Sequence, residues 1–242
     1  MQGDVVQEGP LIAAEAGAPV VLVAFAAVWG AACGLLLPRP AYRLSVEPGE
    51  PWRPARGWLG ARPGPRAGGL AAVTALVCAL LATATGTRPE LGAWLLLAPL
   101  GVLLATVDFA VKRLPDVLTL PLAGLAVLAL GGAALLPEAG GSWGGALWGA
   151  LGLGAGYLLL LLAYPKGMGF GDVKLAVGLG AALGWYGWGV LFLGAFAGVL
   201  FNGLYALVLV VTRRAGRGTE IPFGPFMILG ALAGVVLGAL GA

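Results

Sequence analysis

The chain has 242 residues, of which 60% are hydrophobic and only 10% are charged, with a net charge of +3 at pH 7. Soluble domains carry about a quarter charged residues, so this composition excludes a water-soluble globular protein and predicts that the lipid bilayer is the solvent. The chain contains no histidine, which excludes a serine–histidine nucleophile and leaves no ligand set for zinc. Its two cysteines, Cys33 and Cys78, lie in apolar runs and are expected to be small buried side chains.

The first 68 residues divide into three parts. Residues 1–18 are acidic and lack the Lys/Arg-rich start of a cleavable signal peptide, so we expect a short extracytoplasmic N-terminus followed by a retained transmembrane helix over 19–37. Residues 38–68 form a loop that is rich in Arg, Pro and Gly and contains no cysteine. We expect a cytoplasmic linker that its arginines hold near anionic lipid headgroups, with a docking site for acidic partners as the alternative.

Seven further apolar runs follow in the remaining part of the chain, residues 69–242. They occupy residues 69–86, 91–107, 117–136, 144–164, 173–187, 189–211 and 222–241. A helix needs about 20 residues to cross about 30 Å of hydrocarbon, and most of these runs qualify. The sequence therefore predicts an all-α polytopic membrane protein, a bundle of about eight transmembrane helices without a sizeable soluble domain.

The charges of the loops support eight crossings. With eight spans, thirteen of the fourteen Lys and Arg residues fall on one side of the membrane, and only Arg88 falls on the other. The positive-inside rule places the basic side in the cytoplasm, so both termini are expected outside. Five tryptophans then fall near the outer ends of the spans, as in an aromatic belt: Trp94, Trp143, Trp148, Trp185 and Trp188.

Glycines repeat at intervals of four in two of the runs. The repeats are Gly145/Gly149, Gly152/Gly156 and Gly230/Gly234/Gly238. Small residues at this spacing let membrane helices approach closely. The abundance of Gly and Ala in this chain is the alternative explanation, and both readings are compatible with a compact bundle.

Most of the eleven acidic residues have an ordinary explanation. Five are expected in solvent outside the membrane: Asp4, Glu8, Glu15, Glu90 and Glu138. Glu47 and Glu50 lie among arginines in the cytoplasmic loop, and Glu220 precedes a helix, where the helix dipole favours a carboxylate. The three that remain are Asp108, Asp116 and Asp172.

Asp108 and Asp172 are expected at the same depth, at the cytoplasmic edge of the hydrocarbon. Asp108 ends the run 91–107, and Asp172 opens the run 173–187. A carboxylate at that depth marks a functional site by default, because its burial is costly. Two facing carboxylates cannot both ionise cheaply, so one can act as general base on a water molecule and the other as general acid. We expect this pair to hydrolyse a peptide bond without a metal or another cofactor.

The residues around Asp172 read PKGMGFGDVKLA, with glycines at 167, 169 and 171. We expect these glycines to leave the backbone bare, so that an extended substrate strand and its water come within reach of Asp172. Lys174 either extends to the membrane interface or lowers the proton affinity of Asp172. Asp116 follows Pro115 at a helix start, and we expect it to cap that helix.

Two other classes of function remain open at this point. A small transporter or proton-coupled carrier also uses intramembrane aspartates, although transporters favour charges near the bilayer midplane and related repeats in two halves. A catalytically inactive assembly factor would keep the scaffold without needing the aspartate pair. Tolerance of Asp108→Asn would indicate this last class.

Three stretches of the chain resemble a known family. They read VDFAVKRLPDVLTLPL, KGMGFGDVKLAVGLGAALGW and IPFGPFMILGAL. Together they resemble the type IV prepilin peptidases, membrane aspartyl proteases of the GxGD class, over about residues 91–242. The resemblance implies that Asp108 and Asp172 are the catalytic pair and that no cofactor is used. It also implies prepilin-like protein substrates of type IV pilus or type II secretion systems, whose short basic leader is removed ahead of a hydrophobic helix.

The same resemblance implies a multi-pass protein of the bacterial cytoplasmic membrane, with its site on the cytoplasmic side and no nucleic-acid partner. It does not indicate an oligomeric state. The N-terminal third departs from the bifunctional members of the family, which carry paired CxxC zinc motifs in a larger cytoplasmic domain and also N-methylate the new terminus. Because the loop 38–68 has no cysteine, we expect no methyltransferase activity.

Overall fold

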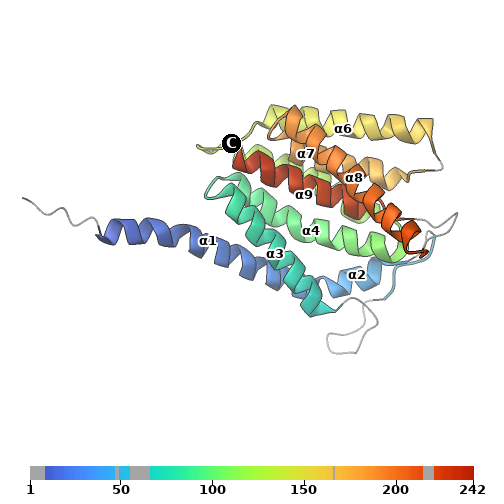
Figure 1. Ribbon diagram of the computed structural model, residues 1–242, viewed down its shortest axis with the longest axis horizontal. Coiled ribbons are helices and arrows are strands. Elements are labelled where there is room, and N and C mark those ends of the chain that lie inside the picture. The colour runs from blue at the N-terminus through green and yellow to red at the C-terminus, as the bar shows by residue number, and fades with distance from the viewer. Residues whose placement is uncertain (1–8, 47–48, 55–65, 166, 215–220) are drawn as a thin grey trace, which may run out of the picture.

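The computed structural model describes residues 9–46, 49–54, 66–165, 167–214 and 221–242 (Figure 1). Within these residues the chain forms nine helices and no strand. The helices are α1 (Gly9–Leu36), α2 (Pro38–Leu44), α3 (Ala67–Thr85), α4 (Glu90–Val111), α5 (Asp116–Ala133), α6 (Trp143–Ala163), α7 (Phe170–Gly184), α8 (Trp188–Val211) and α9 (Gly224–Leu240). The protein is therefore an all-α polytopic membrane protein, as its composition predicted.

Eight of these helices coincide with the eight predicted runs. Six of them, α1 from Pro19 onward, α3, α4, α5, α6 and α8, are long and apolar enough to cross a membrane. The 17 residues of α9 fall just short of that length. The largest difference in a boundary is at α1, which begins at Gly9, ten residues before the predicted start of the first span.

The remaining helix, α2, lies in the segment that the sequence predicts to be a linker. Pro38 stands at its first position, where proline is favoured because the first N–H groups of a helix need no partner within it. Ala41 and Val46 are buried, and the Arg53 guanidinium lies over the Tyr42 ring at 4.7 Å. The linker prediction is therefore wrong for 38–46, where α2 packs against α4. Residues 49–54 are mostly exposed and contact α2 through Arg53, while 47–48 and 55–65 lie outside the described residues.

The short helix α7 lies at the centre of the bundle. It has 15 residues, about 22 Å of helix, and 11 of them are buried. It contacts α5, α6, α8 and α9. Phe170 at its start is exposed, but from Asp172 onward neighbouring helices cover most of α7 and shield it from lipid.

Glycines let several neighbouring helices pack backbone against backbone. A Cβ atom added to Gly145 of α6 would lie 2.5 Å from the Gly184 oxygen of α7, and one added to Gly149 would collide with Gly180. Gly230 and Gly234 of α9 meet Gly194 of α8 in the same way. The predicted close packing is thus confirmed at these repeats, while Gly156 faces open space and Gly152 meets only the Trp188 ring.

The first helix packs mainly against α3 and extends away from the rest of the bundle (Figure 1). A Cβ atom at Gly30 would collide with the backbone of α3 at Thr74, and one at Gly34 would collide at Ala71. Cys78 is buried at this contact, as predicted, whereas Cys33 is only partly buried.

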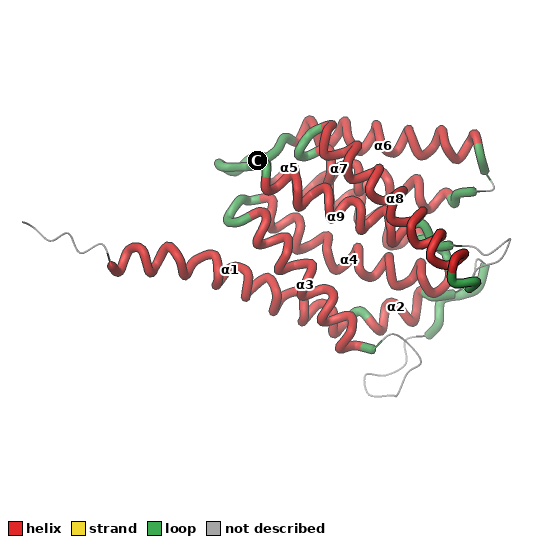
Figure 2. The backbone as a smooth tube through the Cα atoms, viewed as in Figure 1, coloured by secondary structure: helices red, strands yellow, loops and turns green. Residues whose placement is uncertain are grey.

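The bundle has two ends, where the connections between helices gather (Figure 2). We call the one that holds α2, the last turn of α4 and the first turn of α7 the basic end, since these described basic residues lie there: Lys112, Arg113, Lys174, Arg213 and Arg214. The other is the C-terminal end, where α9 finishes. Of the five predicted belt tryptophans, Trp143, Trp148 and Trp188 are exposed, but Trp94 and Trp185 are buried in the core. The belt prediction is wrong for these two, because neighbouring helices cover them.

Candidate active site

Asp108 lies in the last turn of α4, at the basic end of the bundle, and is only 4% exposed. Its Oδ2 atom accepts a hydrogen bond of 3.0 Å from the backbone N–H of Gly224, the first residue of α9. The helix ends three residues later because Lys112 adopts a left-handed conformation, with φ of 50°. The aspartate is therefore held between the end of one membrane helix and the beginning of another.

Asp172 is the third residue of α7 and is 9% exposed. Its Oδ2 atom accepts a hydrogen bond of 3.0 Å from the N–H of Gly169, the residue that caps the helix. The Asp172 N–H donates in return to the Gly169 oxygen at 3.1 Å. This reciprocal arrangement is the acidic half of a capping box, so Asp172 stabilises the helix start with one oxygen.

The structure brings these two aspartates to the same end of the bundle, where the charge of one acts on the other. The side chain of Leu114, in the connection between α4 and α5, lies between Gly171, which precedes Asp172, and Gly224, which binds Asp108. A Cβ atom added to Gly171 would lie 2.9 Å from Leu114 Cβ, and one added to Gly224 would lie 3.1 Å from Leu114 Cδ2. Each carboxylate is thus anchored by a glycine N–H, and one leucine packs against both glycine-containing segments.

Two aromatic residues complete the surroundings of the pair. Tyr157 of α6 is buried and lies within reach of the charge on Asp172. Its ring stacks on Phe223, with centroids 6.0 Å apart. Because Phe223 directly precedes Gly224, this contact ties α6 to the segment that anchors Asp108.

The glycines before Asp172 do not all leave the backbone bare, as the sequence suggested. A Cβ atom at Gly167 would collide with the Tyr164 ring, and one at Gly171 would collide with Leu114. Gly169 differs, because a Cβ there would meet only Asp172 Oδ2 at 3.6 Å and the Gly171 nitrogen at 3.9 Å. Two of the three glycines therefore serve close packing within the protein, and Gly169 alone is open to an approaching chain.

Asp116 and Lys174 pair with each other. Asp116 is the first residue of α5, and its Oδ2 atom lies 2.6 Å from Lys174 Nζ. The Asp116 side chain is 62% exposed, and Lys174 Nζ also lies 4.8 Å from the centroid of the Phe170 ring. The residue at the capping position of α5 is Pro115, so the predicted capping role of Asp116 is replaced by an exposed ion pair that occupies Lys174.

Glu90 was expected in solvent, but it is fully buried at the C-terminal end of the bundle. Its carboxylate accepts hydrogen bonds from the Gly140 N–H at 3.2 and 3.3 Å and from the Tyr186 hydroxyl at 3.3 Å. The Arg88 guanidinium lies 3.9 Å away and donates to carbonyl oxygens at the ends of α3 and α9. Burial raises the pKa of Tyr186 to about 12, so its hydroxyl stays protonated and donates.

One signal in the sequence could have revealed this buried cluster. Arg88 is the single basic residue on its side of the predicted membrane, and Glu90 follows it by two positions. A lone Arg beside a Glu at a helix start indicates a pair. The cluster lies far along the bundle from Asp108 and Asp172, at the other end of α4 and α7.

No group of three or more His, Cys, Asp or Glu side chains that could hold a metal ion occurs in the described part of the chain. The groups that the structure gathers around the aspartate pair are the two carboxyl groups, the N–H groups of Gly169 and Gly224, and the Tyr157 side chain.

Comparisons with known proteins point to one family. Residues 95–211, which include both aspartates, match the profile of the Type IV leader peptidase family. A "Prepilin leader peptidase/N-methyltransferase" of Pseudomonas aeruginosa is 36% identical over 159 residues, which is 64% of this chain and 53% of that protein. Relatives of the same name from Stutzerimonas stutzeri and Aeromonas hydrophila are 36% and 34% identical, over 66% and 64% of this chain and 55% and 53% of theirs.

The chain spans about half the length of these curated relatives. No solved structure matches it. The family match covers the segment that contains two of the three motifs read from the sequence, around Asp108 and around Asp172. Over residues 95–211 the chain is similar to the Type IV leader peptidase family, which confirms the resemblance that its motifs indicated.

Proposed function

We propose that this protein is a membrane-embedded aspartic endopeptidase that removes the short basic leader from prepilin-like precursors. The observation that carries the proposal is the pair of buried carboxylates, Asp108 and Asp172, at one end of the bundle. Each is anchored through one oxygen by a glycine N–H, and Leu114 packs against the glycine-containing segments beside both. The family match over 95–211 supports leader processing as the reaction.

The proposed chemistry needs one proton shared by the pair. The ionised carboxylate accepts a proton from a water molecule, whose oxygen attacks the carbonyl carbon of the scissile peptide bond. The protonated carboxyl group donates its proton to the carbonyl oxygen, which gives a neutral gem-diol. The C–N bond then breaks as the leaving nitrogen takes up a proton and the diol returns one to the pair, so protons balance over the cycle.

We place the site on the cytoplasmic side of a bacterial membrane. Thirteen of the fourteen basic residues fall on the side of the predicted topology that corresponds to the basic end. A substrate with a basic leader and an apolar helix would keep its helix in the bilayer and present the leader at the inner edge.

Co-expression with a prepilin tests the proposal. Wild type is expected to convert the precursor to a faster-migrating product on a gel, while Asp108→Asn and Asp172→Asn each leave the precursor intact with unchanged membrane insertion. Asp116→Asn is the matched control, because Asp116 lies at the same end of the bundle but is exposed and paired with Lys174. Near-complete cleavage by either Asp108→Asn or Asp172→Asn would refute the catalytic pair.

We further infer that the chain lacks N-methyltransferase activity, although its curated relatives are named for both activities. The loop 38–68 contains no cysteine and cannot form the zinc site that the bifunctional members carry. Mass spectrometry of the processed pilin, with S-adenosylmethionine present, should show a free amino terminus. A mass 14 Da higher, about one methylene group, would contradict this inference.

A further inference from the structure

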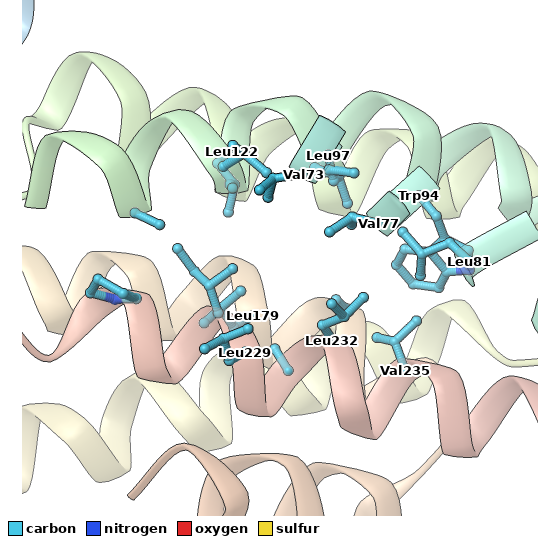
Figure 3. Close-up of a pocket in the computed structure, with 18 of the residues that line it drawn as sticks. Val73, Val77, Leu81, Trp94, Leu97, Leu122, Leu179, Leu229, Leu232 and Val235 are labelled. Atoms are coloured by element: carbon cyan, nitrogen blue, oxygen red, sulfur yellow. The ribbon is translucent and has the colours of Figure 1, made fainter. Parts of the chain in front are cut away.

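An apolar groove runs along the bundle between α3, α4 and α9 (Figure 3). Its volume is about 360 Å³, and its lining comes from α3, α4, α5, α7 and α9. On α4 the lining extends from Trp94 to Phe109, a rise of about 22 Å. Side chains such as Leu97 and Trp94 on one side lie opposite Leu232 and Val235 on the other (Figure 3).

Neither aspartate lines the groove, but each lies along a helix that lines it. Leu97 and Gly101 line it, and Asp108 follows them at helical spacings of eleven and seven residues, on the same face of α4. Leu179 lines it from α7, seven residues beyond Asp172 and again on the same helix face. At the basic end the lining finishes with Phe109 and Pro225, the sequence neighbours of Asp108 and of Gly224. An elongated occupant that passes this end of the groove therefore meets the carboxylate pair.

The chemistry of the groove restricts what such an occupant can be. Its lining is apolar apart from Thr106, so a peptide inside it must be apolar and must satisfy its own backbone hydrogen bonds, which requires a helix. Small residues line it at Ala98, Gly101, Ala105 and Ala182, and such residues let a second helix approach closely. A volume of 360 Å³ admits the side chains along one face of a helix, not a whole helix.

We propose that this groove seats the apolar helix of the substrate, with the helix axis along α4 and the scissile bond at the basic end, between Asp108 and Asp172. This inference rests on the proposed endopeptidase function and adds to it the surface that selects substrates. The enzyme then recognises the part of the precursor that remains in the membrane, and the groove sets the distance from that helix to the pair. Val73 and Leu229, both half-exposed, form the outer rim that the rest of the substrate helix faces.

Photo-crosslinking tests the position of the substrate. A benzophenone side chain is placed at Val73 or at Leu229 in an Asp172→Asn background, which holds uncut prepilin. Both positions are expected to crosslink the apolar helix of the substrate. The matched control is Leu128, an exposed residue of α5 outside the groove lining, which should not. Crosslinks from Val73 and Leu229 to phospholipid alone would overturn the proposal, since an acyl chain would then be the occupant.

A pair of glycine variants tests the role of the groove in cleavage. A Cβ atom at Gly101 meets only Ile228, at 3.5 Å, so Gly101→Leu extends a side chain into the groove. Gly124→Leu adds the same side chain to α5, where a Cβ has open space around it. We expect Gly101→Leu to slow cleavage of full-length prepilin by about a hundredfold and to spare a soluble leader peptide without the helix. Gly124→Leu should cleave both substrates as wild type does.

The outcomes separate the two proposals. If wild type cleaves neither substrate, the endopeptidase function itself fails. If wild type cleaves prepilin and Gly101→Leu does so at the same rate, the function stands and the groove proposal fails. If Gly101→Leu cleaves neither substrate, the substitution has disabled the site itself. The crosslinks from Val73 and Leu229, measured with Gly101 unchanged, then decide whether the substrate helix occupies the groove.

Discussion

Glycine N–H groups hold both carboxylates of the candidate site. Gly224 donates to Asp108 and Gly169 donates to Asp172, each at 3.0 Å. Each bond fixes one oxygen of the carboxyl group, which lowers the cost of burying it. The position of a catalytic carboxylate within a fraction of an ångström decides its effectiveness, so these two glycines are positioning residues of the proposed reaction.

Gly224→Ala should disable the site without unfolding the protein. The added Cβ would lie 2.8 Å from Asp108 Oδ2 and 3.1 Å from Leu114 Cδ2, so the carboxylate must move. We expect the initial rate of prepilin cleavage to fall by about a hundredfold. Gly203→Ala is the control, because a Cβ on that residue of α8 has open space around it. Equal rates for the two variants would show that the Gly224–Asp108 contact is not needed.

The proposed pair also predicts a bell-shaped pH dependence. At low pH both carboxyl groups are protonated and no base remains to activate water. At high pH both are ionised and no acid remains to protonate the carbonyl oxygen. Initial cleavage rates measured from about pH 4 to about pH 10 should therefore fall at both extremes. A flat profile would count against acid–base catalysis by these residues.

At the scale of whole helices, the two ends of α4 have different roles. Its last turn carries Asp108, and its first residue, Glu90, lies in the buried cluster with Arg88, Gly140 and Tyr186. Arg88 also donates to the Ala239 oxygen near the end of α9. The cluster thus joins the ends of α3, α4 and α9 with the α7–α8 connection, and it holds the helices that carry the aspartates in register.

Glu90→Ala should destabilise the bundle strongly. The change leaves the Arg88 charge partly buried without its carboxylate, which typically costs about 3 to 5 kcal/mol. Asp116→Ala, which removes the exposed partner of Lys174, should cost at most about 1 kcal/mol. Unfolding of both variants in detergent measures the difference. If Glu90→Ala lowers the free energy of unfolding no more than Asp116→Ala does, the buried cluster contributes little to stability.

For the whole molecule, the arrangement of charges should determine the orientation in the membrane. Apart from Arg88, the described basic residues gather at the basic end, and the candidate site lies at that end. The positive-inside rule then places the site in the cytoplasm. The apolar groove runs from this end toward the C-terminal end, so orientation also decides from which side a substrate leader is presented.

Cysteine labelling tests this orientation. In a Cys33→Ala, Cys78→Ala background, Leu135→Cys marks the C-terminal end and Thr212→Cys marks the basic end, since both residues are exposed. A membrane-impermeant maleimide added to intact cells should label position 135 at once and position 212 only after permeabilisation. The reverse pattern would place the aspartate pair outside the cell.

Several features could be predicted from the sequence because they depend on local composition. The apolar runs located eight of the described helices, six of them long and apolar enough to cross a membrane, since transfer of a segment into lipid depends on its own side chains. The sequence also placed Asp108 and Asp172 at the same end of the bundle. Successive helices cross in alternating directions, so the position of each residue at the end or start of its apolar run decides on which of the two sides it lies. The glycine repeats indicated tight packing of α6 and of α9, because a missing Cβ allows close approach whatever the neighbour is.

Other features depended on which segments become neighbours, and hydropathy does not carry that information. Gly224 binds an aspartate 116 residues away, and Leu114 fills the space beside Gly171 that appeared open in the sequence. Glu90 and Trp94 were expected at the membrane surface but are buried. Their environment is set by side chains from other helices, so only the tertiary structure could decide it.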